Sequence, residues 1–378
     1  MKQFNDFLKE KLREIEEAGL YRERIVLPPD TVEFSSNDYL GLRDNPSTKE
    51  KLYRSIESIA LGSGASALIS GFHPIQKELE ESLAEFKNTE SCLVVGSGYM
   101  ANIGLIPIIS EEGDTIFSDQ LNHASIIDGI RLSKASKLVY RHCDVEDLER
   151  KIRTTNTKGK RIIVTDSVFS MDGDIAPLDE LVKISQKYDA VLVVDEAHST
   201  GVLGKEGRGI FSHFGIKPTD NTILMGTLSK AVGSYGAFIC GTKLLINYLI
   251  NRMRSVIFTT ALSPLQNFVS LYNLRAIKEE VYRRERLFRN VETFLEISKR
   301  EGLDVNFFGT PIITYIVREP KRTLYIRDKL LENGFFIGAV RPPTVPPGTS
   351  RLRITITSKH TPEDIKRFLS TLSEIVNG

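Results

Sequence analysis

The sequence predicts an α/β protein, with a large domain built on a mostly parallel, seven-stranded sheet and a smaller C-terminal α+β domain. Two observations carry this prediction. Short apolar runs of strand length alternate with helix-like segments through the middle of the chain, and beyond Pro264 long helical periods replace that alternation. We expect three parts: an N-terminal helix and arm over 1–45, a large domain over 46–264, and a linking helix with the small domain over 265–378.

The first segment is predicted to be an amphipathic helix. Phe4, Leu8, Leu12 and Ile15 recur at helical spacing within residues 3–20, with charged residues between them. Such an apolar stripe needs a partner surface, so we expect the helix to pack on the body of its own molecule or on a partner subunit.

Seven short apolar runs mark the strands of the large domain. They lie at 92–95, 114–118, 137–141, 161–165, 190–194, 222–225 and 236–240. Polar residues follow three of these runs: Asp166, then Asp195 with His198, then Thr227 to Lys230. Because ligands of such sheets bind at the carboxyl ends of the strands, we expect these residues to face one site.

The C-terminal part follows a different pattern. Residues 265–300 are predicted to form a long helical region, 311–318 and 351–357 strands, and 323–333 and 361–376 helices. This arrangement is typical of a small α+β domain.

Composition limits the class of protein. The net charge of +1 gives no overall basic field that would attract nucleic acid or a membrane surface. No apolar run approaches the roughly 18 residues that a membrane-spanning helix needs. The three cysteines are odd in number and lack paired spacing, which favours a reducing compartment. We therefore expect a cytoplasmic protein with no nucleic-acid and no membrane partner.

The string Asp195-Glu196-Ala197-His198 has three interpretations. In a nucleic-acid ATPase it would bind magnesium, but that requires a phosphate loop of the form Gly-x4-Gly-Lys-Ser/Thr, which the sequence lacks. In a metal site it would need further ligands at workable spacing, yet the six histidines are scattered, so we predict no metal. A carboxylate and a histidine that merely satisfy a strand end remain as a structural alternative.

Lys230 makes the structural alternative less attractive. It follows an apolar strand and is flanked by the small residues Thr227, Ser229 and Gly236, which leave room for a planar ligand. A lysine that can form a Schiff base, with an aspartate for a pyridinium nitrogen, is typical of a pyridoxal phosphate site. The sequence therefore predicts pyridoxal 5'-phosphate as a cofactor held by Asp195 and Lys230.

Two further segments have both a functional and a structural interpretation. Ser97 to Asn102 follows a strand and is expected to open a helix, where backbone N–H groups can form a phosphate cradle, although many strand-to-helix turns look alike. His123 could neighbour a helix cap, or its ring could stack on the cofactor. The residues alone leave both interpretations open.

Four segments taken together resemble the α-oxoamine synthases, which are pyridoxal phosphate enzymes of fold type I. They are Gly226 to Lys230, Asp195 to His198, Phe169 to Asp174 and Ser36 to Gly41. The match runs from about residue 20 to the C-terminus, with the segments in the family's order. The resemblance implies a fold type I transferase, specifically an acyltransferase, that works as a homodimer with composite active sites.

Three residues would carry the chemistry in this family. Lys230 would hold the cofactor as a Schiff base and later take the α-proton of the substrate. Asp195 would face the pyridine nitrogen, and His123 would stack on the ring.

Other matching residues would bind the cofactor without reacting. His198 and Ser170 would hydrogen-bond the phenolic oxygen, and the segment with Thr259 and Thr260 resembles one that reaches the phosphate of the neighbouring subunit's cofactor. The whole cofactor set implied by the resemblance is Gly98, Tyr99, His123, Ser170, Asp195, His198, Thr227, Lys230, Thr259 and Thr260.

The resemblance also implies substrate contacts. Arg353 matches the arginine that binds the amino-acid carboxylate, with Asn37 as a helper. Thr344 and Arg22 match contacts to the acyl chain, with Arg24 as the alternative to Arg22.

The segment Val340 to Gly348 is similar to one member of the family. That member joins L-alanine to a pimeloyl thioester, carried by CoA or acyl carrier protein, with loss of CO2 in biotin synthesis. Glycine C-acetyltransferase and 5-aminolevulinate synthase remain alternatives, because all members share the cofactor residues. Ala67 departs from the family, since many relatives carry an arginine or another polar residue there.

Overall fold

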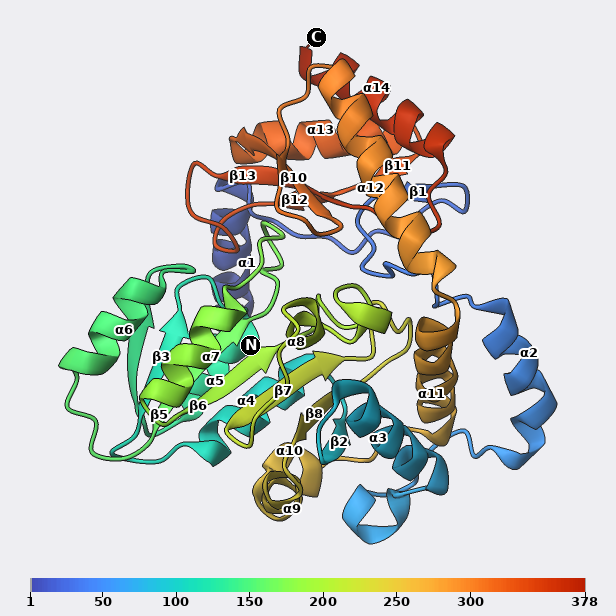
Figure 1. Cartoon of the computed structure of the whole chain (residues 1–378). Coiled ribbons are helices and arrows are strands. Elements are labelled where there is room, and N and C mark those ends of the chain that lie inside the picture. The colour runs from blue at the N-terminus through green and yellow to red at the C-terminus, as the bar shows by residue number, and fades with distance from the viewer. Residues whose placement is uncertain (1, 378) are drawn as a thin grey trace. The chain divides into compact units, whose positions relative to one another are not determined.

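The computed structural model describes residues 2–377, which separate into two compact units (Figure 1). The large unit comprises Asp38–Ser170 and Asp174–Glu285. The small unit comprises the described residues up to Asn37, Met171–Gly173, and those from Arg286 onward. Among residues 2–377, no helix is both long and apolar enough to cross a membrane.

The large unit is built on a seven-stranded sheet, which confirms the predicted fold class. In space the strand order is β2-β8-β7-β6-β5-β3-β4. Strand β8 runs antiparallel to both of its neighbours, and the other pairs are parallel. Each predicted run coincides with one strand: β2 (Ser91–Val95), β3 (Thr115–Asp119), β4 (Ser136–Tyr140), β5 (Arg161–Asp166), β6 (Ala190–Asp195), β7 (Thr222–Thr227) and β8 (Ala237–Gly241).

Helices cover both faces of this sheet. On one face, apolar residues of α4, α5 and α9 pack with alternate strand residues such as Ile162 and Val164 of β5. Ile163 points to the opposite face and is also fully buried, so the strands read as continuous apolar runs. The helices of the large unit are α2 (Pro46–Ser55), α3 (Pro74–Lys87), α4 (Gly98–Ile109), α5 (Ala124–Leu132), α6 (Val145–Thr154), α7 (Leu178–Lys187), α8 (Ile210–His213), α9 (Lys243–Arg252), α10 (Arg254–Ile257) and α11 (Pro264–Glu279).

The small unit is the predicted α+β domain. Its four-stranded antiparallel sheet has the order β12-β13-β10-β9, and a two-stranded parallel pair joins β1 to β11. The strands are β1 (Val32–Glu33), β9 (Asn306–Phe307), β10 (Ile312–Arg318), β11 (Phe335–Phe336), β12 (Gly338–Val340) and β13 (Ser350–Thr355). The helices are α1 (Lys2–Glu17), α12 (Tyr282–Arg300), which begins at the end of the large unit, α13 (Pro320–Glu332) and α14 (Pro362–Asn377).

Two helical segments differ in detail from the prediction. Residues 265–300 are not one helix, because α11 ends at Glu279 and Glu280 leaves the helical conformation (φ −94°, ψ 60°) before α12 begins. The apolar stripe of α1, from Phe4 to Ile15, is between 40% and 64% exposed at Phe4, Leu8, Leu12 and Ile15. Within residues 2–377 this stripe is therefore not buried, and its packing on a partner subunit stays a prediction.

Candidate active site

Three adjacent parallel strands of the large unit end in polar residues. Asp166 ends β5, Asp195 ends β6 and Thr227 ends β7, and Asp166 and Asp195 are register partners. Lys230 follows shortly after β7, in the connection to β8. Because the strand interiors are apolar and covered on both faces, polar side chains can reach a ligand only at these ends.

A cavity of about 180 Å³ lies at these strand ends, and all of its lining residues belong to the large unit. The larger cavities near Asn88 hold none of the predicted site residues. Seven residues of the predicted cofactor set line the small cavity: Gly98, Tyr99, His123, Asp195, His198, Thr227 and Lys230.

Asp195 is buried and held in one orientation. The Ala197 N–H donates to its Oδ1 at 2.9 Å, and Asn102 Nδ2 donates to its Oδ2 at 2.9 Å. Asn102 comes from α4 and also donates to Ser125 Oγ at 2.9 Å. Two N–H donors therefore direct the carboxylate, and Asn102 is a positioning residue that the sequence reasoning did not single out.

Asp166 is a second buried carboxyl group at this cavity; it was expected at this end of the sheet but was not assigned to the cofactor set. Burial, and then the charge of Asp195, raise the pKa of Asp166 well above its usual range. Its Oδ2 accepts a hydrogen bond from the His123 N–H at 2.7 Å. The raised pKa favours the protonated form of Asp166, which lessens the repulsion between the two neighbouring carboxyl groups.

Lys230 belongs to a hydrogen-bonded chain of three side chains. Its Nζ lies 2.7 Å from His198 Nε2, and His198 Nδ1 lies 2.7 Å from the hydroxyl of Tyr39. Tyr39 is buried and packs edge-on against the His198 ring. The chain gives the Lys230 amine a fixed place and a route along which its proton can be shared.

His123 is the N-cap of α5, in line with the structural interpretation, and the stacking of its ring on a cofactor stays a prediction. Its Nδ1 accepts from the Ser125 N–H at 3.2 Å, which leaves the ring proton on Nε2. The protein around the ring disfavours the charged form and lowers the pKa of His123, an effect that Lys230 reinforces and Asp195 opposes. A neutral imidazole whose ring lines the cavity can stack on a planar ligand.

The start of α4 forms the other end of the cavity. Ser97 caps the helix, its Oγ accepting from the Met100 N–H at 3.2 Å. An added Cβ at Gly98 would find its nearest atoms on Met225 and Thr227 at 3.9 and 4.0 Å, so the glycine leaves open space toward the cavity. Backbone N–H groups at a helix start that face such a space favour an anion.

Three residues of the predicted cofactor set lie elsewhere in the large unit. Ser170 is partly buried in the loop that the Val168↔Ile175 bridge closes. Thr259 and Thr260 follow α10, beside Phe258, whose side chain is 71% exposed. In the described part of the chain, none of the three lines the cavity.

The predicted substrate residues all fall in the small unit. Arg353 on β13 is buried and donates to Thr355 Oγ1 at 2.8 Å and to Asn37 Oδ1 at 3.1 Å, so Arg353 and Asn37 are brought together. Arg22 is exposed in the arm after α1, and Thr344 is exposed in the turn after β12.

Arg341 ties this arm to the rest of the small unit, which the sequence reasoning did not anticipate. It donates to the carbonyl oxygens of Gly19 at 2.6 Å and Tyr21 at 3.4 Å, next to Arg22. Burial and the charges of Arg327 and Arg22 lower the pKa of Arg341. The guanidinium is therefore occupied by the arm itself.

The chain is similar to known proteins over nearly its whole length. The family described as aminotransferase class I and II matches residues 29–372. A protein of Aquifex aeolicus, provisionally named 8-amino-7-oxononanoate synthase, is 48% identical over 373 residues, covering 98% of this chain and 99% of that protein. The 8-amino-7-oxononanoate synthase of Lysinibacillus sphaericus is 43% identical over 382 residues, covering 98% of each chain.

Solved structures give the same picture. The 8-amino-7-oxononanoate synthase of Francisella tularensis has a TM-score of 0.78 and 32% identity, over 92% of this chain and 98% of that chain. A variant of the serine palmitoyltransferase from S. paucimobilis, with a bound PLP–myriocin aldimine, has a TM-score of 0.90 and 27% identity, over 98% of this chain and 97% of that chain.

Proposed function

Because the chain belongs to the aminotransferase class I and II family and, within it, to the 8-amino-7-oxononanoate synthases, we propose the following reaction. The enzyme condenses L-alanine with a pimeloyl thioester and releases CO2 and the thiol carrier. The product is 8-amino-7-oxononanoate, and the pathway is biotin synthesis. Pyridoxal phosphate is the cofactor.

The cavity at the ends of β5, β6 and β7 is the observation that carries this proposal. This cavity has a volume of about 180 Å³ and is lined by an amine, a carboxylate, a neutral imidazole and the start of a helix. Pyridoxal phosphate offers a matching group to each of them: an aldehyde, a cationic ring nitrogen, an aromatic face and a phosphate. The residues present therefore fit this cofactor.

When bound, the cofactor supplies an electron-poor ring that accepts the electron pair left on the α-carbon of the amino acid. Asp195, directed by Asn102 and Ala197, would hold a positive charge on the ring nitrogen. Burial raises the pKa of the neighbouring Asp166, which favours the neutral form of that carboxyl group beside Asp195. His123 would cover one face of the ring.

Lys230 would hold the cofactor covalently and then act as the base that removes the α-proton of alanine. Its amine hydrogen-bonds to His198, and His198 in turn hydrogen-bonds to Tyr39. These contacts hold the amine at one position in the cavity. A general base must lie within hydrogen-bond distance of the proton that it removes, and these hydrogen bonds restrain the Lys230 amine for that purpose.

The phosphate contacts remain a proposal for Gly98, Tyr99 and Thr227. In this structure the Thr227 hydroxyl donates to the Gly236 carbonyl at 3.0 Å and accepts from the Ser229 N–H at 3.2 Å. The hydroxyl hydrogen would have to turn away from Gly236 to reach a phosphate. Ser229 also lines the cavity, and its hydroxyl lies 2.7 Å from that of Thr227.

Arg353 and Asn37 would bind the carboxylate of alanine, since a buried arginine fork matches a carboxylate. Arg22 and Thr344 would contact the pimeloyl chain, which CoA or acyl carrier protein can deliver. We further propose a homodimer in which Thr259 and Thr260 reach the partner's cofactor, and Ser170 as a partner of the phenolic oxygen. The three cysteines are free thiols, which supports the cytoplasm as its location.

A product assay tests the proposed reaction. Purified holoenzyme is given L-alanine with pimeloyl-CoA, or glycine with acetyl-CoA, and both products are followed by mass spectrometry. We expect 8-amino-7-oxononanoate to form much faster than 2-amino-3-oxobutanoate, and Lys230→Ala to form neither. Faster turnover of glycine with acetyl-CoA would reassign the chain to glycine C-acetyltransferase.

A further inference from the structure

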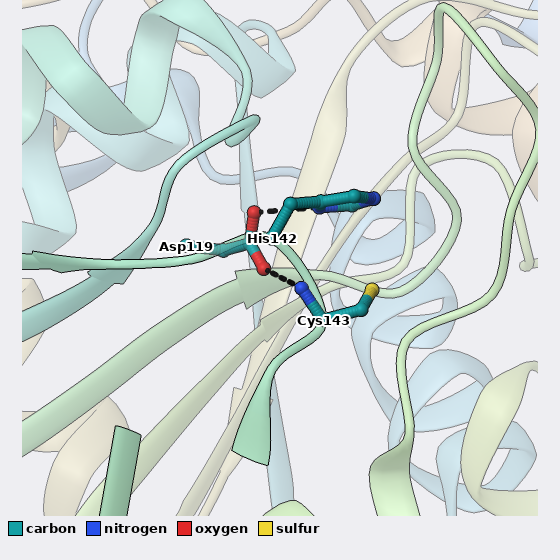
Figure 2. Close-up of side chains that lie close together, drawn as sticks. All are labelled: Asp119, His142 and Cys143. Atoms are coloured by element: carbon teal, nitrogen blue, oxygen red, sulfur yellow. Dashed lines mark hydrogen bonds and ion pairs between the residues drawn. The ribbon is translucent and has the colours of Figure 1, made fainter. Parts of the chain in front are cut away.

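A cluster of titratable side chains lies outside the cavity, at the edge of the sheet formed by β3 and β4. Figure 2 shows Asp119, at the end of β3, facing His142, just after β4, with Cys143 beside them. His142 Nδ1 lies 2.9 Å from Asp119 Oδ1, and His142 Nε2 lies 2.7 Å from Asp174 Oδ2. One imidazole therefore bridges two carboxylates from different segments.

The contacts of this imidazole favour its cationic form. Burial alone would lower the pKa of His142, but the hydrogen bonds to Asp119 and Asp174 raise it to about 12. Both ring nitrogens face carboxylate oxygens, so both act as N–H donors. Charge-assisted hydrogen bonds of this kind are about twice as strong as neutral ones.

Three donor atoms of the cluster, on Asp119, His142 and Cys143, lie within 4.8 Å of one another, a spacing that could also hold a metal ion. The carboxylate of Asp119 is already occupied, however. Its Oδ1 accepts from the Leu121 N–H at 2.8 Å and its Oδ2 from the Cys143 N–H at 2.8 Å. A cation would have to displace the imidazolium proton, so the contacts favour a proton-held cluster over a metal site.

Both aspartates fix a segment that carries a predicted cofactor residue, Asp119 through its carboxylate and Asp174 through its backbone carbonyl. Asp119, through the Leu121 N–H, holds the turn that leads to His123. Asp174 closes the loop that contains Ser170, since the Phe169 N–H donates to the Asp174 carbonyl at 3.0 Å. The His142 ring also packs edge-on against Phe169, with ring centroids 4.4 Å apart.

We propose that His142, bridging Asp119 and Asp174, is a positioning residue that sets His123 and Ser170 in their places around the cofactor. The inference rests on the proposed function, because it assumes that the cavity binds pyridoxal phosphate. His142 does not line the cavity, so by this proposal it touches neither the cofactor nor the substrate. It acts by joining the two segments that do.

His142→Gln removes the charge and one of the two bonds, while Asp174→Asn keeps the loop's size and removes one carboxylate. Both variants should raise the Kd for pyridoxal phosphate about tenfold or more, the loss of a charge-assisted hydrogen bond. The visible circular dichroism of the bound cofactor should weaken, and kcat should fall while the KM for alanine stays within about twofold. A purely structural role would lower only the unfolding temperature and leave the spectrum of the folded holoenzyme unchanged.

Two control variants separate the effect of the His142 contacts from the loss of an unrelated histidine and from the loss of a metal ligand. His213→Gln replaces an exposed histidine of α8 and should match the wild type. Cys143→Ser keeps both ion pairs but removes the sulfur ligand that a metal would use, and it should also match the wild type. Wild-type affinity and spectrum in His142→Gln and Asp174→Asn would overturn the proposal.

A metal would overturn it as well. Stoichiometric zinc in the purified wild type, lost together with cofactor binding on chelation and in Cys143→Ser, would assign the cluster to a metal ion. Failure of the wild type itself to bind pyridoxal phosphate would instead contradict the proposed function, so the two failures are distinguishable.

Discussion

The turn that follows Asp195 is anchored by a buried ion pair between Lys87 of α3 and Glu196. Lys87 Nζ lies 2.6 Å from Glu196 Oε2, and both side chains are 1% exposed. The same ammonium donates to Thr200 Oγ1 at 2.8 Å and to the Arg208 carbonyl at 2.7 Å, which satisfies all three of its protons. Lys87 therefore connects the helix before β2 to the segment just after the end of β6, where Asp195 lies.

Lys87→Met is the perturbation that tests this anchor. Methionine fills a similar space but leaves the Glu196 carboxylate buried, with only the Ile210 N–H donating to its Oε1 at 2.8 Å. Removing one partner of a buried pair costs about 3–5 kcal/mol, because the remaining charge is uncompensated. Since proteins of this kind are stable by about 5–15 kcal/mol, the variant should lose roughly a fifth of its stability or more.

Urea unfolding of the cofactor-free protein, followed by far-ultraviolet circular dichroism, measures this loss. The double variant Lys87→Met/Glu196→Gln removes the stranded charge and should recover most of it. Lys183→Met, which breaks an exposed pair with Asp179, serves as the matched control and should change stability little. An unchanged midpoint in Lys87→Met, or no recovery in the double variant, would refute the electrostatic account.

Further predictions follow from single contacts. Burial raises the pKa of Glu80 from 4.5 to about 7, so between these pH values the folded state binds a proton that the unfolded state has lost. The free energy of unfolding should therefore fall as pH rises from 4.5 to 7, and Glu80→Gln should abolish that fall in unfolding curves at pH 5 and 8. The pKa of His142 is raised from 6.5 to about 12, so the protonated imidazole stabilises the folded state fully below pH 6.5 and loses this effect as pH approaches 12. The unfolding midpoints of the wild type and His142→Gln should therefore converge as pH rises. Ser97→Ala removes the N-cap of α4 and should cost about 1 kcal/mol in urea unfolding, unless the Met100 N–H finds another acceptor. Arg353→Lys should raise the KM for alanine about tenfold and leave that for pimeloyl-CoA unchanged, because an ammonium cannot form the paired contact; equal changes in both would contradict the assignment.

The large unit could be predicted from the sequence because its strands are buried on both faces. Residues such as Ile162, Ile163 and Val164 of β5 are all fully buried, which makes the strand visible as a continuous apolar run. The two-residue strands β1 and β11 could not be found in this way, since Val32 pairs with Phe335 across most of the chain. The break between α11 and α12 at Glu280 could not be predicted, because no glycine or proline marks it in the sequence.

The site was predictable where its residues end strands and not where they come from distant segments. Asp195 and Lys230 stand out because each follows an apolar run. Their partners do not stand out, because they are distant in the sequence. Tyr39 and His198 are 159 positions apart, and Asn102 and Asp195 are 93 positions apart. Asp166 ends a strand as Asp195 does, so the sequence placed it at the same end of the sheet; its pairing beside Asp195 is visible only in the structure.

The central claim is that Lys230 holds pyridoxal phosphate in the cavity at the ends of β5, β6 and β7. Borohydride reduction of the purified holoenzyme, followed by peptide mapping with mass spectrometry, tests it most directly. We predict loss of the visible absorbance band and one phosphopyridoxyl group per chain, on Lys230. A protein that stays colourless with added cofactor, or a label on another lysine, would contradict the account.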